Sequence, residues 1–322
     1  MTPPIWLIGA GTMAREYAFV LKALKQPFDV IGRSEISAKS FKKATGCNVK
    51  TAGLQSVLEK NTAPAVAIVA VGVDQLAKVA KDLIYSGTKY ILLEKPGALN
   101  LEEIYSLNLL ANKKKAKVFV AYNRRFYQSV QQTKDLIKKD GGALSMNFEF
   151  TEWEHAIKPL KSAVKERLVI ANSSHVIDLA FYLCGKPKKW KCWHAGSLDW
   201  HPASARFCGS GITDQGIMFS YLSDWQAQGR WSLEIMTNKR RLILRPMEQL
   251  QEIKKGSILV KNIKSENTID TDFKPGLFLQ TKKFLKKEES YLFCSLSDQV
   301  ENIKIYSKIA GYSYKQISQK QL

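Results

Sequence analysis

The chain has 322 residues, of which 45% are hydrophobic and 24% charged, and its formal net charge is +20. At about 150 residues per domain this length predicts roughly two domains, each with a full apolar core. The composition excludes a disordered chain, and no apolar run approaches the ~18–20 residues that a membrane-spanning helix needs.

The cysteines and the basic residues exclude further classes. The N-terminus lacks the basic region of a secretory signal, and the odd number of cysteines, with no Cys-x-x-Cys pair, argues against disulfides and a zinc site. We therefore expect free thiols, no metal and a cytoplasmic location. Lysine greatly outnumbers arginine and lies in small scattered clusters, which predicts a solvated basic surface with no specific nucleic acid and no membrane as partner. Attraction of an anionic substrate or of a cellular polyanion stays open.

Short apolar segments alternate with helical patterns in the first third of the chain. Continuous apolar strands separated by helices indicate βαβ crossovers and a parallel sheet that is covered on both faces. We predict an α/β domain over residues 1–121. Its strands are expected at 5–8, 28–31, near 49, 66–70, 90–93 and 118–121, and its helices at 12–24, 36–44, 54–59, 75–85 and 101–112.

The rhythm changes after residue 121, where period-two alternation becomes frequent. Such alternation is typical of antiparallel strands with one solvated face. Residues 122–322 are therefore predicted to form an α+β domain with a large, mostly antiparallel open sheet. Alternating segments lie at 144–150, 217–221, 230–235, 241–244 and 257–260, and helices are expected at 129–139, 174–183, 277–287 and 298–310.

A glycine-rich loop follows the first predicted strand and opens the first helix. Gly9 permits a tight turn, Gly11 lets the backbone approach a pyrophosphate, and Ala14 keeps the helix close to the sheet. Thr12 and Met13 begin the helix, whose free N–H groups and positive dipole end favour phosphate. The loop's place after the first strand of a βαβ series predicts a Rossmann NAD(P)-binding domain.

The cofactor type is indicated at the end of the second strand. A site for NAD usually carries an acidic residue there, which binds the ribose 2′-hydroxyl. This chain has Arg33 and Ser34 instead, 19 residues or more after Ala14. A guanidinium and a hydroxyl suit a 2′-phosphate, so NADP(H) is favoured over NAD(H). In the alternative, Arg33 only stacks on adenine and Glu35 binds the hydroxyl.

Two further segments carry residues that can move protons. Glu94, Lys95 and Pro96 follow the fifth strand, at the sheet edge where α/β proteins bind ligands, and a lysine there can bond a substrate oxygen. His175 starts an apolar helix, with Asp178 one turn later on the same face, and imidazole exchanges protons near neutral pH. Without further information, a solvated lysine and a helix-capping histidine are the plainer alternatives.

Four motifs occur together in order and resemble those of the Gfo/Idh/MocA oxidoreductases, the relatives of glucose–fructose oxidoreductase and inositol dehydrogenase. The motifs are Gly9-x-Gly11, Glu94-Lys95-Pro96, Tyr122-Asn-Arg-Arg-Phe126 and Ser174-His175-Val-Ile-Asp178. The resemblance covers essentially the whole chain. It implies that Lys95 and His175 are catalytic, and that the second domain binds substrate and pairs subunits through its sheet as a homodimer or homotetramer.

The resemblance also implies a set of binding residues. Cofactor contacts are expected from Gly9, Gly11, Thr12, Met13, Ala14, Arg33, Ser34, Val71, Glu94, Lys95 and Pro96, and substrate contacts from Asn123, Arg124, Asn172 and Asp178. The chain departs from the family pattern at two places. Many relatives have an acidic or amide residue where Ala171 stands, one place before Asn172, and Thr-Pro-Asn where this chain has Val71-Gly72-Val73.

The predicted activity is hydride transfer between a nicotinamide and a secondary alcohol or ketone of a sugar, nucleotide sugar or cyclitol. The alternative is a non-catalytic dinucleotide-binding regulator of the same fold, which the loss of Lys95 or His175 would have favoured. Both residues are present. The departures at Val71 and Ala171 line the nicotinamide or substrate side in relatives, so the sequence names neither one substrate nor the direction of the reaction.

Overall fold

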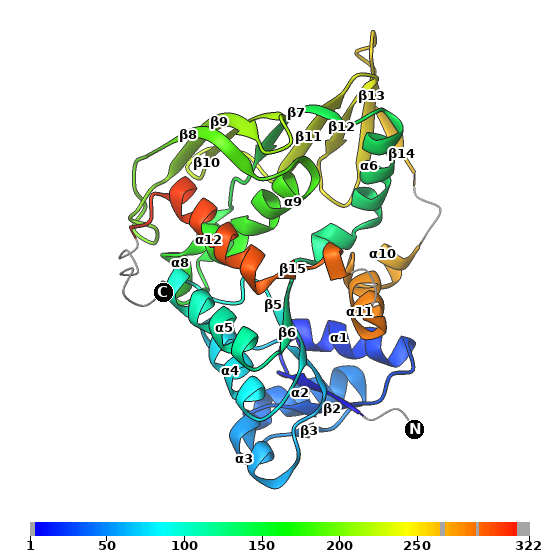
Figure 1. The fold of residues 1–322 in the computed structure, drawn as a ribbon, viewed down its shortest axis with the longest axis vertical. Helices are drawn as coiled ribbons and strands as arrows, with labels where there is room; N and C mark the ends of the chain where they lie inside the picture. The colour runs from blue at the N-terminus through cyan, green and yellow to red at the C-terminus, as the bar shows by residue number, and fades with distance from the viewer. Residues whose placement is uncertain (1–3, 265–267, 288–289, 314–322) are drawn as a thin grey trace. The chain divides into compact units, whose positions relative to one another are not determined.

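The computed structural model describes residues 4–264, 268–287 and 290–313 (Figure 1). The chain divides into two compact units. The first comprises the residues up to Asn123 together with Thr271–Glu301, and the second comprises Arg124–Asp270 together with the residues from Asn302 onward. Residues 271–301 thus belong to the first unit although they follow the second unit's sheet in the sequence.

The first unit contains a seven-stranded sheet in the order β15-β6-β5-β4-β1-β2-β3. Strands β1 to β6 pair in parallel in the order 3-2-1-4-5-6, which is the doubly wound order of dinucleotide-binding sheets. The predicted parallel sheet is confirmed. Its strands are β1 (Ile5–Ile8), β2 (Phe28–Ile31), β3 (Val49–Lys50), β4 (Val66–Val69), β5 (Tyr90–Glu94), β6 (Lys117–Ala121) and the antiparallel edge strand β15 (Cys294–Ser295).

The helices of this unit follow local sequence signals. Ser34 caps the N-terminus of α2 by accepting the Ser37 N–H, and Gly46 ends that helix in the left-handed conformation. Helix α1 packs against α11 from the far end of the sequence, as Figure 1 shows in blue and orange. The helices are α1 (Thr12–Ala23), α2 (Glu35–Thr45), α3 (Gly53–Lys60), α4 (Leu76–Tyr85) after the short η1 (Val73–Gln75), α5 (Leu101–Lys113) and α11 (Leu277–Lys286), with η4 at Ser290–Leu292.

The second unit contains an eight-stranded sheet in the order β14-β13-β12-β11-β7-β10-β9-β8. Only the β7–β10 pair is parallel among its described strands, so the predicted mostly antiparallel sheet is confirmed. The strands are β7 (Ala143–Glu149), β8 (Pro187–Ala195), β9 (Arg206–Thr213), β10 (Met218–Asp224), β11 (Ser232–Thr237), β12 (Arg240–Leu244), β13 (Leu250–Lys254) and β14 (Lys261–Ile263).

Helix α9 (Ser174–Cys184) packs on β7 and β11 and covers one face of this sheet. Apolar side chains fill the layer between them, with the Phe148 ring 5.7 Å from Phe181 and 5.1 Å from Tyr221. The remaining helical segments are η2 (Asn123–Phe126), α6 (Gln128–Lys139), α7 (Glu154–Ile157), α8 (Ser162–Lys165), the π-helical turn η3 (Val169–Ser173), α10 (Ile269–Asp272) and α12 (Leu296–Ala310).

One alternating segment that the sequence assigned to the second sheet does not form a strand. Residues 257–260 alternate in the sequence but form no strand, and β14 begins only at Lys261. Ile258, Leu259 and Val260 are 97%, 60% and 50% exposed, so none of the three side chains packs into a core. Alternation predicts a strand only where one face of it reaches a core.

All five cysteines are free thiols in the structure, as the sequence predicted. Within the described ranges, no three side chains of the metal-ligating types gather in a position to hold an ion. Within the same ranges, no helix is both long enough and apolar enough to cross a membrane.

Candidate functional site

The glycine-rich loop joins β1 to α1 and comes very close to the end of β4. Gly9 has φ +123°, and a Cβ atom placed on it would lie 2.2 Å from the carbonyl oxygen of Ala70. The Gly9 N–H donates to the Ile31 carbonyl at 2.8 Å, which ties the loop to β2 as well. Only glycine fits this position, because both the conformation and the close backbone approach exclude a side chain.

Gly11 has a different role in the same loop. It is the N-cap residue of α1, has extended backbone angles, and a Cβ placed on it meets no described atom within 4 Å. Within the described residues, no side chain caps the helix at this end. A helix N-terminus without a side-chain cap suits an anionic group such as a pyrophosphate.

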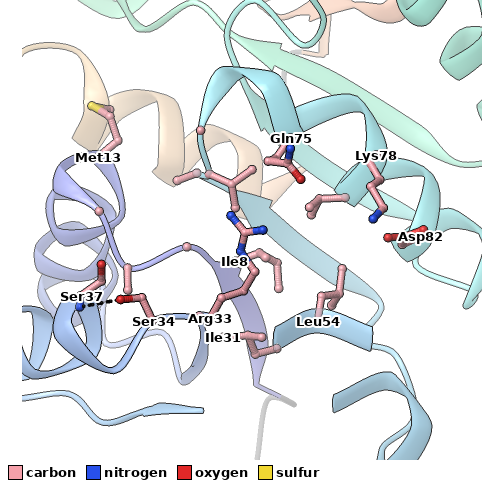
Figure 2. A pocket seen from close by; sticks show the side chains of 18 of the residues that line it. Ile8, Met13, Ile31, Arg33, Ser34, Ser37, Leu54, Gln75, Lys78 and Asp82 are labelled. Carbon is pink, nitrogen blue, oxygen red and sulfur yellow. Dashed lines mark hydrogen bonds between the residues drawn. The ribbon is translucent and has the colours of Figure 1, made fainter. Parts of the chain in front are cut away.

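A cavity of about 490 Å³ lies at this loop, within the first unit (Figure 2). It opens where β1 and β4 diverge in chain order, the switch point at which open α/β sheets bind their ligands. Of the predicted cofactor residues, Gly9, Gly11, Thr12, Met13, Arg33, Ser34 and Val71 line it. Ala14, in the first turn of α1, is fully buried, and Glu94, Lys95 and Pro96 are not among the residues that line the cavity.

The charged side chains that line the cavity are two basic ones, Arg33 and Lys78, and one acidic one, Asp82. Arg33 follows β2 and points into the cavity, and Lys78 and Asp82 face it from α4 (Figure 2). Ser34 Oγ accepts the Ser37 N–H at 3.3 Å, so its own proton stays available for a further acceptor. Glu35 does not line the cavity.

Glu94 ends β5 as a buried carboxyl group and accepts a hydrogen bond from the Tyr17 hydroxyl of α1 at 2.8 Å. Burial raises the pKa of Glu94 above its ordinary value, against the hydrogen bond from Tyr17 and the charge of Lys95. Burial and the neighbouring Glu94 also raise the pKa of Tyr17. The sequence did not indicate Tyr17 as a partner for Glu94.

A second side chain that the sequence did not indicate holds the same turn. Gln299, fully buried on α12, donates through Nε2 to the Pro96 carbonyl at 2.9 Å and to the Tyr122 hydroxyl at 3.0 Å. The Glu94-Lys95-Pro96 segment is therefore fixed from two sides, by Tyr17 and by Gln299. Such support keeps a functional side chain in a defined position.

His175 lies in the first turn of α9, directly after the π-helical turn, and is 7% exposed. Its ring is 5.9 Å from the buried ring of Trp231. π-Helical turns within helices are frequent at functional sites. The catalytic role of His175 and that of Lys95, which belong to different units, remain predictions from the resemblance.

Three predicted substrate residues have partners inside the protein. Asn123 donates to the Pro275 carbonyl at 3.0 Å, and Asn172 donates to both carboxylate oxygens of Glu152 at 3.1 Å. Asp178 accepts two bonds from Arg125, at 2.8 and 2.6 Å. Their roles toward a substrate remain predictions. The sequence did not single out Glu152, a buried carboxylate that also accepts from Ser173 at 2.7 Å.

The ion pair of Asp178 with Arg125 allows a stability prediction, because both side chains are buried (2% and 8% exposed). Arg125→Met leaves a buried carboxylate without its partner, and we expect the free energy of unfolding to fall by about 3–5 kcal/mol. Urea denaturation measures this change in the free energy of unfolding. The control Lys50→Met breaks the Lys50–Asp29 pair, which is 48% and 37% exposed, and should change stability by less than about 1 kcal/mol. Equal effects of the two substitutions would contradict a structural role for Asp178.

The sheet order, the loop and the cavity together define a dinucleotide-binding Rossmann domain. The comparison with protein families agrees. Residues 5–122 match the Gfo/Idh/MocA family, described as "Oxidoreductase family, NAD-binding Rossmann fold". This part of the chain is therefore similar to the NAD-binding Rossmann domain of the Gfo/Idh/MocA oxidoreductases, the family that its motifs resemble. A comparison with curated proteins finds no match.

Several solved structures match the fold of nearly the whole chain. Levoglucosan dehydrogenase in complex with NADH and levoglucosan matches with a TM-score of 0.77 and 17% identity over 96% of each chain. An oxidoreductase from Agrobacterium radiobacter in complex with NAD+, L-tartaric acid and magnesium has a TM-score of 0.78 and 11% identity, over 97% of this chain and 96% of that one. UDP-N-acetylglucosamine 3-dehydrogenase from Acidithiobacillus ferrooxidans has a TM-score of 0.74 and 13% identity, over 96% and 97%. At identities this low, the matches establish the shared fold alone.

Proposed function

We propose that this protein is an NADP(H)-dependent dehydrogenase or reductase that acts on a secondary alcohol or ketone of a sugar-like substrate. The observation that carries the proposal is the cavity at the sheet's switch point. The N-terminus of α1, which no side chain caps, lies at this cavity, and the Arg33 side chain points into it. The family match supports the oxidoreductase class. The sugar substrate is supported by the relatives whose names include levoglucosan and UDP-N-acetylglucosamine.

The residues of the first unit fit the cofactor. Gly9 and Gly11 keep the phosphate path free of side chains, α1 presents its N–H groups, and Arg33 with Ser34 would hold the 2′-phosphate. When bound, the nicotinamide gives or takes the hydride of the reaction. The protein has to supply binding, orientation and the movement of a proton.

Oxidation of a secondary alcohol removes a hydride from carbon and a proton from the hydroxyl group. We assign the proton to Lys95 and His175. The Lys95 ammonium group would donate a hydrogen bond to the substrate oxygen, and the neutral imidazole of His175 would accept the proton that leaves it. In the reverse direction the protonated His175 would return the proton to the carbonyl oxygen as the hydride reaches the carbon.

A screen in both directions tests the function. Purified protein is mixed with NADPH and ketone sugars, or with NADP+ and sugars or nucleotide sugars, and the absorbance of NADPH is followed. Turnover of at least one sugar-like compound is the expected result. Tight NADPH binding without turnover of any compound would favour the non-catalytic regulator.

The cofactor preference gives a prediction at Arg33. We expect the wild type to bind NADPH more tightly than NADH, because the guanidinium pairs with the 2′-phosphate. Arg33→Asp should reverse the preference, since a carboxylate repels the phosphate and bonds the 2′-hydroxyl instead. Each charge-assisted bond is worth about 1.5–3 kcal/mol, or roughly 10- to 150-fold in affinity. Isothermal titration measures the affinities for NADPH and NADH. Lys39→Asp, on the exposed surface of α2, makes the same change of charge and serves as the control. Equal wild-type affinities would contradict the assignment.

We also propose that subunits pair through the open face of the second sheet, as a homodimer or homotetramer. Apolar side chains on neighbouring strands of this sheet are exposed, with Trp193 of β8 at 57%, Ile212 of β9 at 41%, and Met218 and Leu222 of β10 at 62% and 66%. Exposed apolar surface of this kind marks an interaction site.

A further inference from the structure

Trp231 is the centre of a cationic cluster in the second unit. It is 6% exposed, and the guanidinium carbons of Arg124 and Arg230 each lie 4.6 Å from the centroid of its rings. The ring of His175 lies 5.9 Å away. Two arginines and one histidine thus gather around a single buried indole.

Two hydrogen-bond donors in this cluster lack an acceptor. Nε of Arg124 and Nε1 of Trp231 are both buried, and no described atom accepts a hydrogen bond from either. Guanidinium and indole groups have donors only, and a buried donor without a partner is unfavourable because it loses its hydrogen bonds to water. Burial also lowers the pKa of Arg124, because the cation is removed from water.

The neighbouring carboxylates do not supply the missing acceptor. Glu152 accepts hydrogen bonds from Asn172 and Ser173, and its Oε2 is 3.7 Å from Nη1 of Arg230. Glu248 is exposed and lies near the Tyr127 hydroxyl. The two buried donors of the cluster therefore have no acceptor within the described residues. A bound anion would supply one.

We propose that Arg124, Arg230 and Trp231 bind an anionic oxygen group of the substrate, a carboxylate or a phosphate. The planar fork of a guanidinium matches either group, and the indole N–H adds a third donor. The Arg230 side chain is 42% exposed, so a ligand can reach the cluster. The inference rests on the proposed function in one respect: it makes the substrate an acidic sugar or a sugar phosphate instead of a neutral sugar.

The test measures binding without turnover, by isothermal titration of the full chain with three probes. The probes are D-glucuronate, glucose 6-phosphate and neutral glucose, each in NADP+-saturated and cofactor-free protein. At least one acidic probe should bind roughly tenfold or more tightly than glucose. Arg230→Gln should weaken that probe roughly 10- to 100-fold while leaving glucose unchanged.

The matched control is Arg206→Gln, which removes the same charge from an exposed position on β9. It should leave the acidic probe's affinity unchanged. Arg124→Lys keeps the charge but removes the fork, and is expected to weaken the same probe. Because Arg124 is partly buried, the melting temperature of the Arg124→Lys variant is measured as well. If that variant is unfolded, the result for Arg230→Gln decides the outcome.

The two acidic probes separate a carboxylate site from a phosphate site. The inference is overturned if glucose binds as tightly as both acids, if neither acid binds, or if Arg206→Gln weakens the acid as much as Arg230→Gln does. The last result would assign the affinity to the general positive charge of the chain. NADPH titration on the same samples distinguishes this failure from a failure of the proposed function, because the cofactor cavity lies in the first unit.

Discussion

Lys95→Ala and His175→Ala should each lower kcat by roughly 10²–10⁴, the usual contribution of a positioned acid or base. NADPH affinity should stay close to the wild-type value, because neither residue lines the cavity at the glycine loop. The double variant should lose less than the product of the two single losses, since residues that act as a unit are not additive. Steady-state kinetics with the substrate found in the screen measures kcat for the two single variants and the double variant.

The control for the histidine is His155→Ala, which removes an exposed imidazole of the same unit and should turn over normally. If His175 only begins α9, its alanine variant would melt earlier but keep a normal kcat per folded molecule. That outcome would remove His175 from the mechanism. A Lys95→Ala variant with normal kcat would likewise confine the lysine to a solvated role.

The two glycines of the loop should respond to substitution in opposite ways. Gly9→Ala places a methyl group against the Ala70 carbonyl in a backbone conformation that side chains avoid. Strain of this kind costs about 1–3 kcal/mol, and the backbone collision adds to it, so the variant should be strongly destabilised. Urea denaturation should show the loss without any ligand present.

Gly11→Val should leave stability nearly unchanged, because its backbone is extended and a Cβ there meets open space. The side chain would instead occupy the space in front of the α1 N–H groups. Each lost charge-assisted bond should weaken NADPH binding roughly 10- to 150-fold. Gly46→Val, at a glycine remote from the cavity, serves as a control for the substitution itself: it should destabilise α2 but not alter NADPH affinity per folded molecule. Unaltered NADPH binding in Gly11→Val would mean that the loop does not hold the pyrophosphate.

Much of the first unit was predictable from the sequence by itself. Its strands are continuous apolar runs and its helices have period 3.6, so both the elements and the parallel pairing of the strands follow from local patterns. The position of Gly9 and Gly11 between β1 and α1 likewise predicted the loop that the structure places at the cavity. Local signals are sufficient here because consecutive βαβ units allow only one common connection.

The contacts that hold the candidate site were decided by the tertiary structure. Tyr17 meets Glu94 across 77 positions, Gln299 meets Pro96 across 203, and Arg125 meets Asp178 across 53. The cluster of Arg124 and Arg230 on Trp231 has the same origin, because residue 124 reaches the ring from a segment more than a hundred positions earlier. Such pairs have no period and no spacing that marks them in one sequence. They arise when the folded chain buries polar groups, and each buried group then needs a partner that only the three-dimensional packing can bring to it.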